Sequence, residues 1–157
     1  MAKVGCLCGA ILSDVDCPSD NIIYIYRYYE LESVLTQNAN ITLWNYYEST
    51  MENHLYWYCN KCGRVYKFPN GSEAKPDKIY RRETVTEEAH IMDMIEMVAF
   101  SDIEIDTITE YNPDICLKEF LDNRLCTESY FLDKSSGQVY VFDKENCKII
   151  AKYCVEK

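Results

Sequence analysis

The sequence has few of the residues on which many enzymes depend, and it has no long apolar run. Its only two histidines, His54 and His90, have no clear relation to one another or to the cysteines. We find no G-x-S-x-G, H-E-x-x-H, P-loop or G-x-G-x-x-G motif, so no catalytic residues are predicted. No stretch approaches the ~18 uninterrupted apolar residues of a membrane-spanning helix, and the start lacks the apolar core of a signal peptide. We therefore expect a cytoplasmic, non-enzymatic protein that does not bind membranes.

Basic residues are missing from one long stretch of the chain. Between Glu83 and Glu110 there are nine acidic residues and no lysine or arginine, within a formal net charge of −10. The negative electrostatic field of such a stretch repels phosphate groups and attracts basic proteins. We therefore expect a basic protein partner and no binding of nucleic acid. The candidate partner-binding residues are Glu87, Asp93, Glu96, Asp102, Glu104 and Asp106. A solvated face that only maintains solubility is the alternative.

Cysteine, by contrast, is abundant, with nine residues. Cys6 and Cys8 form one close pair, Cys59 and Cys62 form another, and a glycine follows each pair. Four thiolates complete the tetrahedral shell of Zn²⁺ and leave no position for substrate, so we predict a structural zinc site. Two unrelated thiol pairs, or Cys17 in place of a ligand from the first pair, are the alternatives. The other four are expected to be small core hydrophobes: Cys116, Cys126, Cys147 and Cys154.

The residues around the two pairs resemble a known family. The segment Cys6-Leu-Cys-Gly-Ala-Ile-Leu-Ser-Asp14 and the segment Cys59-Asn-Lys-Cys-Gly-Arg-Val-Tyr66 are similar to motifs of small bacterial zinc-ribbon proteins. Many of these are immunity proteins beside polymorphic or contact-dependent toxins, and the resemblance covers residues 1 to about 68. It implies a zinc-ribbon module and a toxin domain as partner.

Local patterns predict the elements of the first half. Residues 54–58 and 64–68 favour paired strands around the second cysteine pair. Residues 21–29 are dense in β-formers and predict a buried strand, and residues 30–37 follow with helical spacing. Residues 41–51 fit a helix and a strand equally well.

The second half begins after a stretch rich in proline and glycine. We therefore expect a zinc-ribbon half over residues 1–70, a linker over 71–77 and a second half over 78–157. The patterns of the second half predict a strand over 78–84, a helix over 87–100, a strand over 101–110 and a helix from 113 to about 126. Three strands should follow, over 128–133, 138–142 and 147–155, joined by turn-rich segments as an antiparallel meander. We find no internal repeat.

These observations lead to a fold and a function. The fold class is α+β, with a zinc-ribbon half built on four cysteines followed by a helix-plus-antiparallel-meander half. The resemblance implies an immunity protein that binds and neutralises a bacterial toxin domain, and the acidic stretch favours a basic nuclease as that toxin. A regulatory or nucleic-acid-associated zinc-ribbon protein is the second hypothesis. An enzyme of unrecognised type is the third.

Overall fold

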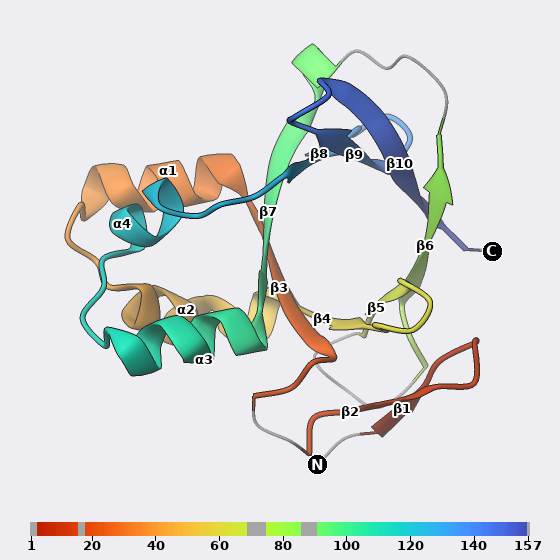
Figure 1. Ribbon diagram of the computed structural model, residues 1–157, viewed down its shortest axis with the longest axis horizontal. Coiled ribbons are helices and arrows are strands. Elements are labelled where there is room, and N and C mark those ends of the chain that lie inside the picture. The colour runs from red at the N-terminus through yellow and green to blue at the C-terminus, as the bar shows by residue number, and fades with distance from the viewer. Residues whose placement is uncertain (1–2, 16–17, 69–74, 86–90, 157) are drawn as a thin grey trace.

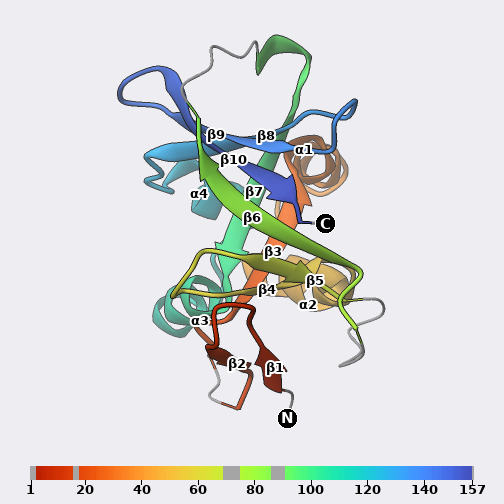
Figure 2. The same cartoon turned by 90° about the vertical axis from the view of Figure 1, so that its right-hand side faces the viewer.

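A closed barrel of eight antiparallel strands dominates the computed structural model, which describes residues 3–15, 18–68, 75–85 and 91–156 (Figure 1). Around the barrel the strands follow the order β10-β6-β5-β4-β3-β7-β8-β9. Their bounds are β3 Ile22–Arg27, β4 Leu55–Tyr58, β5 Val65–Lys67, β6 Lys78–Thr84, β7 Ile95–Ser101, β8 Glu128–Leu132, β9 Val139–Asp143 and β10 Lys148–Val155. A separate hairpin of β1 (Lys3–Gly5) and β2 (Ile11–Ser13) lies beside β4 and β5 (Figure 2).

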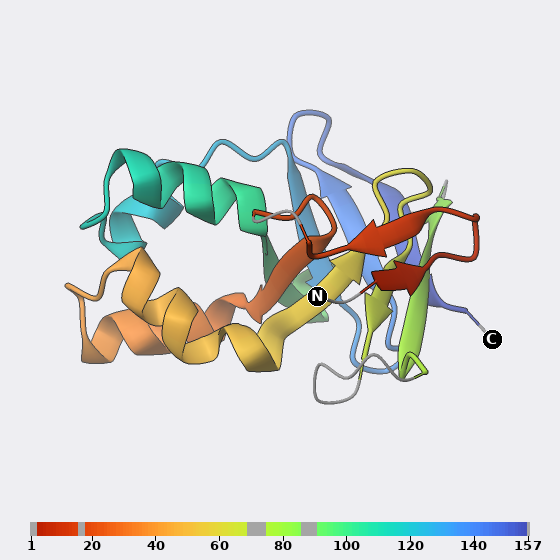
Figure 3. The same cartoon turned by 90° about the horizontal axis from the view of Figure 1, so that it is seen from below.

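Four helices lie together on one side of the barrel, next to β3 and β7 (Figures 1 and 3). They are α1 (Tyr28–Gln37), α2 (Leu43–His54), α3 (Asp102–Tyr111) and α4 (Leu117–Asp122), and a 3-10 turn, η2, covers Ile91–Asp93. Residues 41–51, which the sequence left open, belong mainly to α2. Its cap is Thr42, whose hydroxyl accepts a hydrogen bond from the Asn45 amide at 3.1 Å. No helix in the described part of the chain has the length and apolar content to cross a membrane.

The expected α+β fold is wrong, because the strands close into one barrel. The predicted meander forms as β8, β9 and β10, but β10 also pairs with β6 and so completes the ring. Strands from both sides of the predicted linker are hydrogen-bonded neighbours, with Lys67 of β5 opposite Lys78 of β6. Most of that linker, residues 71–74, lies outside the described residues.

Two elements of the second half are the reverse of what the sequence predicts. Residues 95–101 form β7 where a helix was expected, and residues 102–111 form α3 where a strand was expected; residues 87–90 of the expected helix lie outside the described residues. The Ser101 hydroxyl caps α3 by accepting from the Glu104 amide at 3.0 Å. Asp102 and Glu104 also occupy its first turn, where the helix dipole favours negative charge. Strand β7 forms because it pairs with β3 and β8, and α3 forms because Ser101 caps it. These interactions outweigh the hydrophobic periodicity that predicted the opposite structures.

The packed core lies between the barrel wall and the helices. Strand β3 alternates, with Tyr24 and Tyr26 buried against the helices and the intervening Ile23 and Ile25 lining the inside of the barrel. The helical side of this layer is almost entirely apolar, and its most deeply buried members are Leu31, Leu43, Ile105, Leu117 and Phe120. The hydrophobic effect therefore acts mainly on the outer face of β3 and β7.

The barrel consists of two units with the same order of elements, β-α-α-β-β-β. The first unit runs from β3 to β6 through α1 and α2, and the second runs from β7 to β10 through α3 and α4. First strands pair with each other (β3 with β7) and last strands pair with each other (β6 with β10), both antiparallel. Equivalent strands therefore meet at both seams, which gives the barrel an approximate two-fold symmetry.

Over the segment from β3 to β5, each residue of the first unit corresponds to the residue 74 positions later, in the second unit. Asn38 and Asn112 each end the first helix of their unit, and each amide donates to a carbonyl four residues earlier. Gly63 and Gly137 each take a positive φ, of 78° and 72°, in the turn between the fourth and fifth elements. The same local conformations thus recur at the same spacing.

The loops between the helices of each unit bond directly to one another. The Leu43 amide donates to the Ile115 carbonyl, and the Leu117 amide donates to the Ile41 carbonyl, both at 2.9 Å. These residues correspond in pairs across the two units, so the contact is reciprocal. It fixes the helices of one unit against those of the other.

Candidate functional site

Two hairpins bring together the four cysteines that the sequence predicts as metal ligands. Cys6 and Cys8 lie in the β1–β2 turn, Cys59 and Cys62 lie in the β4–β5 turn, and all four sulfur atoms are within 4.8 Å of one another. The Cys6 and Cys62 sulfurs are 3.5 Å apart, and the Cys8 and Cys59 sulfurs are 3.7 Å apart. Tetrahedral bonds of ~2.3 Å to zinc separate sulfur atoms by ~3.8 Å, so the four residues fit a metal ion. The alternative ligand Cys17 lies outside the described residues.

Glycine allows each cysteine turn to close. Gly9 and Gly63 take φ values of 93° and 78°, a region that L-residues with a side chain rarely adopt. The Gly9 amide donates to the Cys6 carbonyl at 2.9 Å, and the Gly63 amide donates to the Cys59 carbonyl at 2.8 Å. Both pairs of thiols are therefore presented by tight turns that close on a glycine, across three residues in the first turn and four in the second.

Two side chains donate hydrogen bonds to the sulfur atoms. The buried Tyr66 hydroxyl donates to Cys6 Sγ at 3.0 Å, and it accepts from the Leu7 amide at the same distance. The Arg64 guanidinium donates to Cys62 Sγ at 3.4 Å, and its Nε lies 3.1 Å from a carboxylate oxygen of Glu156. Such outer contacts orient metal ligands and stabilise the thiolate form.

The cysteine pKa values differ because their surroundings differ. Burial raises the pKa of the Cys6 thiol to about 12, although the Tyr66 hydrogen bond lowers it. Burial also raises the pKa of Cys62, but the amide and guanidinium of Arg64 outweigh this effect and lower it to about 6. A bound cation would favour the thiolate form of all four residues.

The four remaining cysteines for which a core position was predicted are not buried. Cys147 is exposed, and the other three are half-buried. Cys147 also has a positive φ of 51° in the turn before β10. The prediction of core positions for these cysteines is wrong, since turn and barrel-wall positions leave part of each side chain accessible.

The six predicted partner-binding acids have different environments. Asp93, Glu96 and Asp106 are exposed on η2, β7 and α3, and Glu87 lies outside the described residues. The Asp102 carboxylate accepts hydrogen bonds from the Ser19 amide and from two tyrosine hydroxyls, at 3.0 to 3.3 Å. The Asp102 carboxylate is therefore engaged within the protein and links the start of α3 to β3 and α2.

Glu104 is also engaged within the protein. Its carboxylate lies 2.7 Å from the Nε of Arg124, and a second oxygen accepts from the same guanidinium at 2.9 Å. The acidic stretch is thus not one continuous face. Three of its six predicted residues are available to a partner in the described part of the chain.

The family comparison covers the part of the chain that contains the cysteine cluster. Residues 2–84 match the family model described as Domain of unknown function (DUF8617), a span that holds all four clustered cysteines and ends with β6. The chain belongs to this family. No curated protein and no solved structure matches it significantly.

A shallow groove between α2 and α3 was not expected from the sequence. It has a volume of about 540 Å³ and is lined by Trp44, Asp106, Thr109, Glu110 and Pro113, which together we name the α2–α3 face. The Trp44 side chain is 43% exposed although it packs on Tyr47 with ring centroids 5.4 Å apart. In the sequence, Trp44 favoured the strand alternative for residues 41–51, whereas the structure places it on α2.

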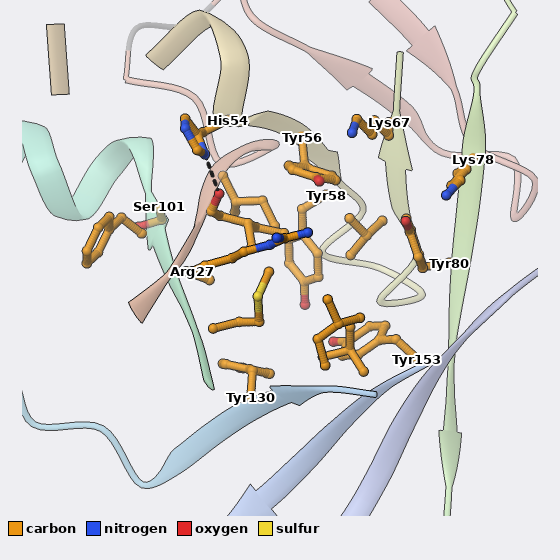
Figure 4. Close-up of a pocket in the computed structure, with 18 of the residues that line it drawn as sticks. Arg27, His54, Tyr56, Tyr58, Lys67, Lys78, Tyr80, Ser101, Tyr130 and Tyr153 are labelled. Carbon is orange, nitrogen blue, oxygen red and sulfur yellow. Dashed lines mark hydrogen bonds between the residues drawn. The ribbon is translucent and has the colours of Figure 1, made fainter. Parts of the chain in front are cut away.

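The inside of the barrel is a second feature that the sequence did not reveal. It contains a cavity of about 800 Å³ (Figure 4). Arg27 and Tyr58 project into this space, and Lys67 and Lys78 lie on neighbouring strands at its wall (Figure 4). His54 lies at its edge, where Nδ1 donates to the Ile25 carbonyl at 2.8 Å. The sequence is rich in tyrosine, with 14 residues, but only the barrel topology shows which tyrosines line its interior.

Proposed function

We propose that this protein is a non-catalytic binding protein of the toxin-immunity type. In this proposal the four clustered cysteines hold a structural zinc ion, and the α2–α3 face binds a basic toxin domain. The observation that carries the partner assignment is Trp44, exposed in a groove beside the carboxylates of Asp106 and Glu110. Large aromatic residues often dominate binding energy at protein interfaces, and acidic neighbours select a basic partner.

The ligand set supports zinc in a structural role. Four thiolates at tetrahedral spacing suit a soft or borderline ion and leave no coordination position for substrate. The ion would join the β1–β2 hairpin to the β4–β5 turn, and it would therefore stabilise the first unit of the barrel. Cys6, Cys8, Cys59 and Cys62 are the residues that would hold it.

Nucleic-acid binding is the alternative, and the distribution of charge favours it less. A nucleic-acid interface needs an accessible basic patch. The α2–α3 face carries two carboxylates and no basic residue, whereas many basic side chains of the described chain line the inside of the barrel. An acidic surface would repel the phosphate backbone.

The proposal predicts that a neighbouring gene encodes the toxin domain, and its test is a titration of this protein with the product of that gene. We expect tight one-to-one binding, and a variant with Trp44→Ala, Asp106→Asn and Glu110→Gln should bind at least ~10-fold more weakly. A second variant, Asp93→Asn with Glu96→Gln, measures the contribution of the exposed acids on η2 and β7. The matched control is Asp77→Asn with Glu145→Gln, which neutralises two exposed acids away from the helices.

Protection of cells that co-express the toxin domain should follow the same order as affinity. Failure of the wild-type protein to bind that domain would contradict the immunity function. Equal affinity of the wild-type protein and the Trp44 triple variant would contradict the α2–α3 face as the interface.

A further inference from the structure

We propose that the inside of the barrel binds a small organic anion with a flat apolar body, and that Lys67 and Lys78 hold its anionic group. This site is separate from the cysteine cluster and from the α2–α3 face. The inference rests on the size of the cavity, on the side chains that line it and on an uneven distribution of charge along the barrel axis.

The cavity has the size and lining of a ligand site. Its volume of about 800 Å³ lies within the ~300–1,000 Å³ of pockets for small molecules, and an eight-stranded barrel is wide enough for one such ligand. Five tyrosines line it together with aliphatic side chains of β3, β7, β8 and β9, and they are Tyr56, Tyr58, Tyr80, Tyr130 and Tyr153. Tyrosine rings offer flat apolar surfaces for stacking and hydroxyl groups for orientation.

Positive charge exceeds negative charge in this lining. Six basic residues face three carboxylates there, although the whole chain has a formal net charge of −10. The basic residues are Arg27, Lys67, Lys78, Arg82, Arg124 and Lys134, and the acids are Glu30, Glu104 and Glu128. A cavity lined by one excess sign within low-dielectric walls concentrates ions of the opposite sign.

At one end of the barrel, protein carboxylates balance the basic residues. Arg124 pairs with Glu104 at 2.7 Å, and Arg82 lies 3.5 Å from Glu128. Glu128 begins β8, and Glu104 follows the end of β7, so both pairs belong to the same rim. This end needs no external anion.

The opposite rim has an excess of positive charge. Because all pairings are antiparallel, the ends of β3, β5, β8 and β10 share this rim with the starts of β4, β6, β7 and β9. Arg27, Lys67, Lys78 and Lys134 line the cavity here, and Glu30 is the one carboxylate among the described lining residues at this rim. Arg27 bonds to the Tyr29 hydroxyl at 2.9 Å.

Lys67 and Lys78 are the pair that an anion would join. They are directly opposite each other on β5 and β6, a placement in which like charges destabilise a sheet. Neither lysine has an ion pair with a carboxylate in the described part of the chain, and Lys67 Nζ lies 5.6 Å from the centroid of the Tyr56 ring. A carboxylate, sulfonate or phosphate between the two ammonium groups would remove the repulsion, while its apolar body would lie among the tyrosines.

The test uses two probes that share one apolar body. 8-Anilinonaphthalene-1-sulfonate carries an anionic group, and N-phenyl-1-naphthylamine is the same ring system without it. We expect the sulfonate to bind one per chain and at least ~10-fold more tightly than the neutral analogue. The variant Lys67→Gln with Lys78→Gln should weaken the sulfonate about 10-fold or more and leave the neutral analogue within about 2-fold.

Two further variants locate the site. Met97→Trp fills the cavity from β7 and should remove binding of both probes, with folding checked by the thermal transition. Lys144→Gln with Lys148→Gln changes two exposed lysines outside the cavity and should leave both probes unaffected. Binding of several molecules per chain, or equal affinity of the sulfonate for the wild-type protein and the Lys67 and Lys78 variant, would overturn the proposal.

Discussion

The hydroxyl group of Tyr66 lies 3.0 Å from the sulfur of Cys6 and donates a hydrogen bond to it. Tyr66 belongs to β5, whereas Cys6 belongs to the β1–β2 turn, 60 residues earlier in the chain. The contact therefore links the N-terminal hairpin to the barrel independently of a metal. It also allows metal binding by the cysteine cluster to be tested without replacing any of the four cysteines.

Replacing Tyr66 with phenylalanine should weaken metal binding. The change removes a donor to Cys6 and leaves the Leu7 amide without its acceptor, so we expect ~10- to 100-fold lower zinc affinity and a loss of about 1–3 kcal/mol in unfolding free energy. Competition with a chromogenic zinc chelator measures the affinity. Tyr140→Phe is the matched control, because Tyr140 is the counterpart of Tyr66 in the second unit and its hydroxyl donates to Gln138. Equal zinc affinity of the two variants would rule out a role for the Tyr66 contact.

Removing a ligand should have a larger effect. Wild-type protein should contain about one zinc ion per chain by elemental analysis, and Cys62→Ser should lose it and destabilise the first unit. Cys116→Ser should retain the metal, because Cys116 lies at the start of α4, away from the cluster. A Cys62 variant with full zinc content would refute the assignment.

Side chains buried outside the barrel should contribute more to stability than side chains inside it. Leu31 is fully buried between α1 and the wall, so Leu31→Ala should cost about 2–5 kcal/mol in unfolding free energy. Met97 lines the cavity and is only half-buried, so Met97→Ala should cost about 1 kcal/mol or less. Denaturant unfolding of both variants makes the comparison. Similar losses would mean that the inside of the barrel is packed as tightly as the helical layer.

The tyrosines of the helical layer predict a loss of stability at alkaline pH. Burial raises the pKa of Tyr24, Tyr26 and Tyr46 above the ordinary value of 10.0, so the folded protein favours their neutral form. This contribution is complete below pH 10 and decreases above it, because the unfolded chain ionises first. We expect these three groups together to lower the unfolding free energy by up to about 4 kcal/mol per pH unit above about pH 10.

The variant Tyr46→Phe provides a control for the alkaline transition. It removes one of the three ionisable groups. The slope of unfolding free energy against pH above about pH 10 should therefore become shallower by the contribution of one proton, about 1.4 kcal/mol per pH unit. A wild-type unfolding free energy that stays constant to about pH 11.5 would contradict the burial of these hydroxyl groups.

Sequence patterns correctly predicted the strands and turns that have strong local signals. The strand at 78–84 coincides with β6, and the predicted meander strands coincide closely with β8, β9 and β10. The hairpin around the second cysteine pair is also confirmed, as β4 and β5. The cysteine spacing correctly indicated a cluster compatible with a metal site, because glycine turns and thiols at short spacing act locally.

The remaining errors concern relationships between distant residues. Closure of the barrel depends on pairing of β6 with β10, which no local pattern encodes. Ile103 and Ile105 alternate with acidic residues, a pattern typical of a strand. Ser101 followed three residues later by Glu104 is instead typical of a helix start, and it indicates α3 correctly. The repeat was missed because few corresponding residues are identical, and they are scattered along both units; examples are Glu30 and Glu104, and Gly63 and Gly137.

Closure of the barrel also limits how another protein can attach to it. In an open sheet, the two outermost strands present free amide and carbonyl groups, and a partner can extend the sheet by adding a strand. Here β6 and β10 satisfy each other, so the barrel has no such edge among the described strands. A partner of the barrel must therefore be recognised through side chains, while strand addition within the described chain is possible only at the small β1–β2 sheet beside the cysteine cluster.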